Sequence, residues 1–238
     1  KLIVSEASQT IKNNLIGAQN VFRAAKKFNK RIIFSSTSEV YGKSKNFPFK
    51  ETDDLIIGSS NLSRWSYACA KLMDEFLAYS YFQESNLPVT IVRLFNTVGP
   101  YQTGQYGMVI PNFVEQAIKG SDITVFGDGN QSRCFCSVED VVSALIKIES
   151  SDSTIGEIIN IGTNEEVSIN NLAELIIKLT KSNSNIKKIP YDIAYEPGFE
   201  DMERRIPDIL KAKHLLNWTP TQNLESILNS VIKFYKYN

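Results

Sequence analysis

The sequence predicts an α/β protein built on a parallel β-sheet. Two short apolar runs, residues 31–35 and 88–94, have the composition of buried strands. Helical patterns precede each of them, over residues 8–28 and 64–84. Because helix and strand alternate in this way, we expect the strands to run parallel, with their carboxyl ends at one edge of the sheet.

The second half of the chain is predicted to form a smaller lobe packed on the first half, because no linker composition separates the two. A strand is expected at residues 123–126 and another at 156–162, and glycine-rich turns separate several elements. Further helices are expected at residues 108–119, 138–149, 168–181, 207–216 and 224–235, and turns at 99–100, 104–107 and 127–130.

The composition excludes several classes of protein. Lys plus Arg and Asp plus Glu number 26 each, so no basic excess favours nucleic acid. No apolar run is long enough for a membrane span, and three cysteines do not form a disulfide framework, which favours the cytoplasm. With a single histidine, His214, we expect no metal site, and Cys134 and Cys136 are interpreted as structural.

The pair Tyr67 and Lys71 is the first candidate for catalysis. Residues four apart share one face of a helix, so the two side chains lie one turn apart. A neighbouring ammonium favours the phenolate, and we therefore expect Lys71 to lower the pKa of Tyr67 and make it a general base. The spacing alone is weak support, because the same pair occurs on solvated helix faces.

A run of hydroxyl side chains strengthens this interpretation. Ser35, Ser36 and Thr37 directly follow the first predicted strand, and Glu39 comes two residues later. Ligands of open parallel sheets bind at the carboxyl ends of the strands. Ser-rich turns are also common in ordinary loops, so the position after the strand is what makes these hydroxyls candidates for ligand binding.

Taken together, the motifs resemble the extended short-chain dehydrogenase/reductase family, and within it the NAD-dependent nucleotide-sugar epimerases, dehydratases and decarboxylases. The resemblance implies a Rossmann-like sheet with a smaller α/β substrate-binding lobe. Residues 1–100 would be the C-terminal part of the NAD-binding domain, and residues 101–238 mainly the nucleotide-sugar lobe, with segments around 123–162 returning to the sheet. The matching segments are residues 13–17, 36–42, 67–71, 93–100, 126–129, 133–135, 138–141, 160–162, 204–208 and 218–220.

The resemblance also implies a role for individual residues. Thr37 would bind the reacting hydroxyl, Tyr67 would remove its proton, and Lys71 would tune Tyr67 and bind the nicotinamide ribose. Arg133 and Arg205 would hold phosphate, which suits the guanidinium fork. The implied cofactor-binding residues are Asn14, Ser35, Ser36, Tyr67, Lys71 and Phe95, and the implied substrate-binding residues are Thr37, Asn96, Val109, Thr124, Phe126, Arg133 and Arg205.

Several reactions of a 4-keto sugar fit this pattern. Glu39 and Arg133 are similar to residues implicated in catalysis by UDP-glucuronate decarboxylases, whereas residues 64–67 and 104–108 resemble UDP-glucose 4-epimerases. Ser38 stands where 4,6-dehydratases carry an acidic residue before the glutamate, which disfavours dehydration. We expect a UDP-glucose/UDP-galactose type 4-epimerase. The alternatives are a UDP-glucuronate decarboxylase, a UDP-glucuronate 4-epimerase, or a non-catalytic nucleotide-sugar-binding fragment or regulator.

One departure from the family lies at the start of the chain. Relatives begin with a strand, a glycine-rich phosphate loop, a helix and an acidic residue that selects the ribose, and none of these is present here. We therefore expect a fragment of a longer protein, truncated at its N-terminus, that is inactive by itself and binds NAD poorly. The resemblance also implies a homodimer.

Overall fold

The computed structural model describes residues 6–104, 108–194 and 202–237. Most of the turn expected at residues 104–107, and most of the segment 104–108 that resembles 4-epimerases, lie outside these described residues. Within them, no helix combines the length and the apolar character that crossing a bilayer requires.

The main sheet consists of three parallel strands in the order β1-β2-β7. β1 (Ile32–Thr37) pairs with β2 (Val89–Leu94), and β2 pairs on its other side with β7 (Ile158–Ile161). The middle strand β2 is buried at every residue except Leu94, as its unbroken apolar pattern predicts. The predicted α/β fold with a parallel sheet is confirmed.

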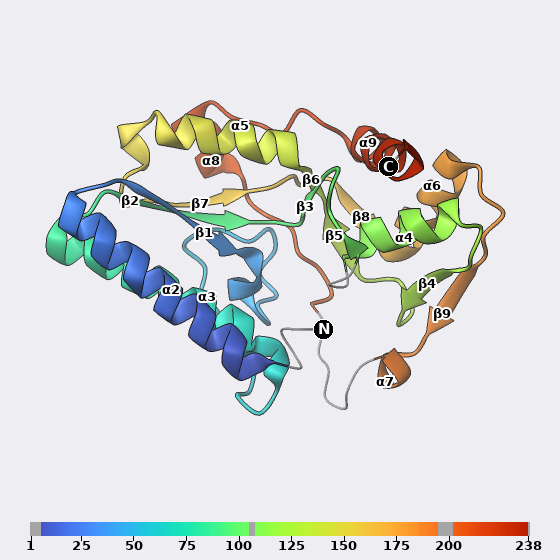
Figure 1. The fold of residues 1–238 in the computed structure, drawn as a ribbon, viewed down its shortest axis with the longest axis horizontal. Helices are drawn as coiled ribbons and strands as arrows, with labels where there is room; N and C mark the ends of the chain where they lie inside the picture. Colours follow the sequence, from blue (N-terminus) through green and yellow to red (C-terminus); the bar gives the residue numbers. More distant parts are fainter. Residues whose placement is uncertain (1–5, 105–107, 195–201, 238) are drawn as a thin grey trace.

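Helices cover both faces of this sheet (Figure 1). α2 (Ala7–Phe28) and α3 (Ser66–Ser85) lie on one face, while α5 (Val138–Glu149) and α8 (Leu210–Leu216) lie on the other. An apolar cluster seals each face against its helices. The buried members include Phe22, Ala25, Ala78, Leu87, Val89 and Ile91 on the first face, and Val92, Val141, Ala144, Ile148, Ile159, Ile161, Ala212 and Leu216 on the second.

The remaining elements form a second lobe beside the carboxyl ends of the strands (Figure 1). Its own core joins three helices and a parallel pair of strands. The second lobe comprises α4 (Val109–Ile118), β4 (Ile123–Phe126), α6 (Ile169–Thr180), β9 (Ile186–Ile189), α7 (Tyr191–Ala194) and α9 (Leu224–Tyr237).

Short ladders and turns connect the sheet to the second lobe. β3 pairs with β6 in parallel, and β5 pairs with β8 in antiparallel fashion. These elements are β3 (Thr97–Val98), β5 (Ser132–Cys134), β6 (Cys136–Ser137) and β8 (Glu166–Ser168), with the 3-10 turns η1 (Ser38–Tyr41), η2 (Ser63–Trp65) and η4 (Asp152–Thr154).

Two sequence-based expectations need correction. The helix expected at residues 207–216 begins only at Leu210, because Pro207 instead forms a β-bridge with Phe49. The sequence analysis also missed β9, which has an exposed lysine pair, Lys187 and Lys188, at its centre. Strands this short and polar carry no periodic apolar signal.

A buried ion pair connects α3 to the main sheet. Arg93 of β2 donates to both carboxylate oxygens of Glu75 in α3, with Nη2 at 2.8 Å from Oε2 and Nε at 3.1 Å from Oε1. The hydroxyl of Ser36 in β1 donates to the same carboxylate. Arg93 Nη1 also donates to the Tyr41 hydroxyl at 3.1 Å, which in turn donates to Asn160 Oδ1 of β7 at 2.8 Å. The network therefore joins all three strands to α3 and η1.

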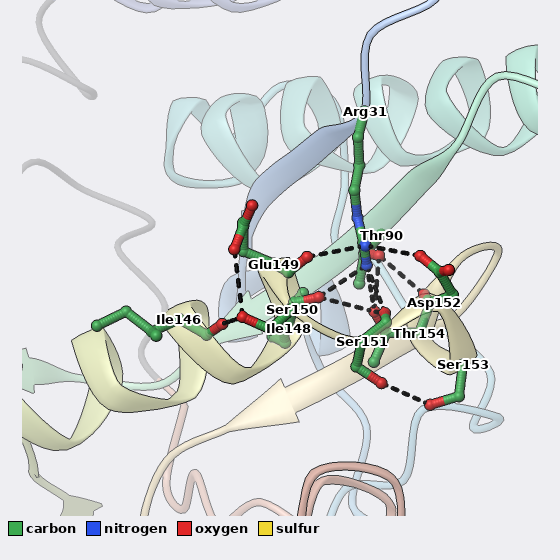
Figure 2. A network of polar contacts seen from close by, with 10 residues as sticks. All are labelled: Arg31, Thr90, Ile146, Ile148, Glu149, Ser150, Ser151, Asp152, Ser153 and Thr154. Carbon is green, nitrogen blue, oxygen red and sulfur yellow. Dashed lines mark hydrogen bonds and ion pairs between the residues drawn. The ribbon is translucent and has the colours of Figure 1, made fainter.

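A second network, at the opposite ends of the strands, involves Arg31 (Figure 2). Its Nη2 donates to the carbonyl oxygens of Ile148 and Ser151 at 2.7 and 2.6 Å, and to the Thr154 hydroxyl at 2.8 Å. Its Nη1 donates to the carbonyl oxygen of Glu149 at 3.0 Å. A guanidinium at a helix C-terminus satisfies carbonyl groups that have no partner within the helix. Arg31 thus attaches the end of α5 to the start of β1.

The Glu75–Arg93 pair allows a direct test of what holds the sheet to α3. We expect Glu75→Gln to lower the free energy of unfolding by about 3–5 kcal/mol, because it leaves a buried guanidinium without a counter-ion. The matched control is Glu115→Gln, which breaks the exposed pair with Lys119 and should cost less than about 1 kcal/mol. Urea denaturation measures both, and equal losses would contradict the assignment.

Candidate active site

A cleft of about 740 Å³ opens at the carboxyl ends of β1 and β2, between the main sheet and the second lobe. Many of the residues predicted for the site line it. From the sheet side these are Thr37, Glu39, Tyr67, Phe95 and Asn96, and from the other side Val109, Thr124, Phe126, Arg133 and Arg205.

The end of β1 and the start of α3 bring two hydroxyl groups together in this cleft. Thr37 is the last residue of β1, and its hydroxyl accepts a hydrogen bond from the Glu39 backbone N–H at 3.2 Å, which caps η1. Tyr67 lies in the first turn of α3, and a side-chain hydrogen bond joins it to Thr37. The two groups predicted to handle the reacting hydroxyl are therefore in contact.

Lys71 does not act on Tyr67 as the sequence analysis expected. The pKa of Tyr67 is raised, first by burial and then by the negative charge of Glu39, and the Thr37 hydrogen bond only partly opposes this. The Lys71 ammonium lies 3.9 Å from Asp74 Oδ2 and 4.0 Å from the centre of the Phe34 ring. The expected lowering of the Tyr67 pKa by Lys71 is wrong here, because burial and the negative charge of Glu39 raise that pKa and Lys71 is not among the groups that shift it.

Glu39 lies between two guanidinium groups. Its Oε2 is 2.6 Å from Arg64 Nη2, and its Oε1 is 2.6 Å from Arg205 Nη2. Burial works to raise the pKa of Glu39, but the charges of Arg205, Arg64 and Arg133 outweigh it and lower that pKa to about 2. Glu39 is thus an ionised carboxylate at neutral pH, placed within the cleft that also holds Tyr67.

Among the described residues that line the cleft, Arg64, Arg133 and Arg205 are the cations and Glu39 is the carboxylate, so these side chains together carry a net positive charge. Asn96 is held beside them: its Nδ2 donates to the Cys134 carbonyl at 3.0 Å, and its Oδ1 accepts from Arg205 Nη1 at 3.4 Å. Guanidinium groups in a partly buried site suit phosphate and carboxylate ligands. The arrangement can bind a multiply charged anion.

Four of the predicted cofactor residues do not line the cleft. Ser36 is occupied by Glu75, as described above, and Lys71 is directed toward Asp74 and Phe34. Asn14 donates to the Thr10 carbonyl of its own helix at 2.8 Å, and Ser35 is exposed on β1. Their assignment to cofactor binding stays a prediction.

Other residues of the cleft were not expected from the sequence. Arg64 was part of a recognised segment but received no role, and Gln131 and Tyr191 were not singled out. Gln131 Nε2 donates to the Tyr191 hydroxyl at 3.0 Å and to the Phe126 carbonyl at 3.1 Å, across two parts of the second lobe. No local pattern marks such residues, because segments far apart in the chain bring them together.

The sequence predicted no metal site and a structural role for Cys134 and Cys136. Over the described residues, no group of three or more His, Cys, Asp or Glu side chains is arranged to hold a metal ion. Cys134 and Cys136 are free and buried, and burial raises the pKa of each thiol to about 12. Thiols with such pKa values are poor nucleophiles, which suits a structural role.

The ionised state of Glu39 predicts how stability depends on pH. Its pKa in the folded chain, about 2, is below the ordinary value of 4.5, so its stabilising contribution is present above pH 4.5 and is lost as the pH falls toward 2. We expect the wild type to exceed Glu39→Gln in free energy of unfolding by up to about 3 kcal/mol near neutral pH, at about 1.4 kcal/mol per pKa unit. Urea denaturation across the acidic range should show this difference shrinking; a constant difference would contradict the ion-pair assignment.

Known proteins resemble the chain over nearly its whole length. A UDP-N-acetyl-α-D-glucosaminuronate decarboxylase from Bacillus cytotoxicus is 41% identical over 237 residues, covering 99% of this chain and 73% of that protein. UDP-glucuronic acid decarboxylase 1 from Danio rerio is 36% identical over 229 residues, covering 95% of this chain and 52% of the relative. The chain therefore spans about half of the latter protein.

Solved structures agree with the sequence relatives. The Bacillus cereus UDP-glucuronic acid 4-epimerase, in complex with UDP-glucuronic acid and NAD, is 28% identical and superposes with a TM-score of 0.84 over 95% of this chain and 68% of that one. The family described as GDP-mannose 4,6 dehydratase matches residues 1–231. The chain belongs to this NAD-dependent family of nucleotide-sugar epimerases, decarboxylases and dehydratases.

Proposed function

We propose that the protein to which this chain belongs decarboxylates a UDP-uronic acid through a 4-keto sugar. The observation that carries the proposal is the ionised Glu39 held by Arg64 and Arg205 in the same cleft as Tyr67. The two relatives described above are both decarboxylases of UDP-uronic acids, and this supports the decarboxylase alternative over the expected UDP-glucose 4-epimerase.

The charge of the cleft supports an acidic nucleotide sugar as the substrate. Three arginines face one glutamate, and a diphosphate and a uronate carboxylate both need guanidinium partners. Arg133 and Asn96 would hold the diphosphate. The apolar strip of Val109 and Phe126, with Thr124, would border the nucleotide base.

The residues present also fit the nicotinamide end of NAD. Lys71 Nζ lies 3.9 Å from Asp74 and over the Phe34 ring, and a turn of its flexible side chain away from them would bring its donors to the ribose hydroxyls. Tyr67 would bind the same ribose, and Phe95, buried at the end of β2, would border the ring. When bound, NAD supplies the acceptor, and later the donor, of the hydride on the sugar C4.

The chain itself handles the proton. Thr37 orients the C4 hydroxyl, and Tyr67 takes its proton as C4 becomes a ketone. The raised pKa of Tyr67 means that the free side chain is a protonated phenol at neutral pH, so it must lose that proton before it acts as a base. A positive charge bound beside Tyr67 would favour the phenolate, and an oxidised nicotinamide would supply such a charge.

A 4-keto uronate is a β-keto acid, and this accounts for the loss of carbon dioxide. The C5–C6 bond breaks, its electron pair passes into the 4-keto group as an enolate, and C6 leaves as carbon dioxide. C5 then takes a proton, the C4 ketone is reduced again, and O4 recovers a proton from Tyr67. The arginines orient the carboxylate of the sugar, and Glu39 stays ionised throughout.

A second candidate is 4-epimerisation of UDP-glucuronate. It is favoured by the likeness to the Bacillus cereus UDP-glucuronic acid 4-epimerase, over 95% of this chain. That reaction shares the 4-keto sugar and the acidic substrate, but it keeps the C5–C6 bond and returns the hydride to the opposite face of C4. Product analysis separates the two.

The decisive experiment incubates the full-length protein and NAD with UDP-glucuronate, UDP-N-acetylglucosaminuronate and UDP-glucose in turn. We expect carbon dioxide and a UDP-pentose from a uronate, and a rate about 10²–10⁴-fold lower for Tyr67→Phe, because the general base is lost. Tyr237→Phe, on an exposed tyrosine of α9, is the matched control and should keep its activity.

Two results would contradict the proposal. Formation of UDP-galactose from UDP-glucose without any release of carbon dioxide from the uronates would restore the epimerase expectation. Equal effects of Tyr67→Phe and Tyr237→Phe would remove Tyr67 from the chemistry.

A further inference from the structure

The two arginines that hold Glu39 differ in how firmly they are fixed. Arg64 lies in η2, directly before α3, and its guanidinium is 5.2 Å from the centre of the Trp65 ring. Trp65 is 3% exposed, and its indole packs so closely on Gly58 that a Cβ there would come within 2.0 Å of Nε1. Arg64 is therefore supported by a side chain that cannot easily move.

Arg205 has a buried donor that is not used by the described part of the fold. Besides the ion pair with Glu39, its Nη1 makes only a long contact of 3.4 Å with Asn96 Oδ1. Its Nε is buried and has no hydrogen-bond partner among the residues that the structure describes. A buried donor without a partner is costly, and a turn of the Arg205 side chain that brought this donor to a ligand oxygen would relieve that cost. Arg205 is the arginine that can accept a second anion.

Charge matching governs how the cleft responds to an acidic sugar. Two carboxylates that share one guanidinium repel each other, whereas each is stabilised if it has its own. Arg133 contributes charge at longer range, but its Nη1 donates to the Ser132 carbonyl at 2.8 Å. The contact geometry around Glu39 thus provides two close guanidinium groups: that of Arg64, which lies beside the Trp65 ring, and that of Arg205, whose buried Nε lacks a hydrogen-bond partner among the described residues.

We propose that Arg64 is a specificity-determining positioning residue, which keeps Glu39 paired while Arg205 turns to the carboxylate of the incoming sugar. The inference rests on the proposed function, because it assumes a uronate in this cleft. It makes Arg64 important for nucleotide sugars that carry a carboxylate and unimportant for neutral ones. Arg64 acts through Glu39 and Arg205 and need not touch the reacting atoms.

The test measures dissociation constants for UDP-glucuronate, UDP-glucose and UDP by calorimetry, using the full-length protein with NAD and the Tyr67→Phe substitution, which slows turnover of the bound sugar. Arg64→Met keeps a long side chain to lie on Trp65 but removes the charge. We expect this substitution to weaken the binding of UDP-glucuronate about tenfold or more, as the truncation of one partner of a buried charge pair does. The dissociation constants of UDP-glucose and UDP should change by less than about threefold. The KM for UDP-glucuronate should rise more than kcat falls.

Two further variants keep the test independent of folding defects. Arg64→Lys retains the charge and should restore most of the affinity for UDP-glucuronate. In a Glu39→Gln background, Arg64→Met should lower the affinity for UDP-glucuronate by less than about threefold, because residue 39 then has no carboxylate to compete with the sugar for Arg205. Unchanged UDP binding reports that each variant is folded.

The outcomes separate the inference from the proposed reaction. Equal weakening of UDP-glucuronate and UDP-glucose by Arg64→Met, or an undiminished penalty in the Glu39→Gln background, would overturn the role of Arg64 even if the wild type releases carbon dioxide. A wild type that releases no carbon dioxide, while Arg64→Met still discriminates between the two sugars, would overturn the reaction and leave the charge role intact.

Discussion

The buried pair of Glu75 and Arg93 is the interaction on which the rest of the site depends. Glu75 lies on the same helix as Tyr67 and Lys71, while Arg93 lies in the middle strand. Through Ser36, the pair also fixes the residue directly before Thr37. The spacing between the Thr37 and Tyr67 hydroxyls therefore follows from an ion pair that makes no contact with the cleft, and it is rigid because breaking one partner leaves a buried charge.

The charges in the cleft have opposing effects on Glu39 and Tyr67. Glu39 is held between two arginines, and its negative charge also raises the pKa of Tyr67. The arginines keep Glu39 ionised, so this opposition persists over the whole physiological pH range. A base that is held protonated until a cation is bound beside it would be inactive without its cofactor, and this would link proton removal to the loaded site.

The sequence predicted the architecture better than the details. The sequence patterns placed the ends of α2, α3, β1 and β2 within one or two residues, since the helices are long and the strands begin with short apolar runs. The short pairings of β3 with β6 and of β5 with β8 were missed, because two or three residues do not establish a pattern. The motif residues that line the cleft were found by resemblance, whereas Arg64 and Tyr191 received no role before the cleft was seen.

By itself, the sequence determined the local geometry: a hydroxyl at the end of a strand, a glutamate two residues later, and a tyrosine and a lysine one helical turn apart. These relations depend only on backbone periodicity and on capping, which act over a few residues. Only the tertiary structure decided which charged side chains pair with each other. Glu39 pairs with Arg64 and Arg205, Lys71 pairs with Asp74, and Tyr67 is desolvated, because burial and Coulomb interactions are set by segments that are distant in the chain.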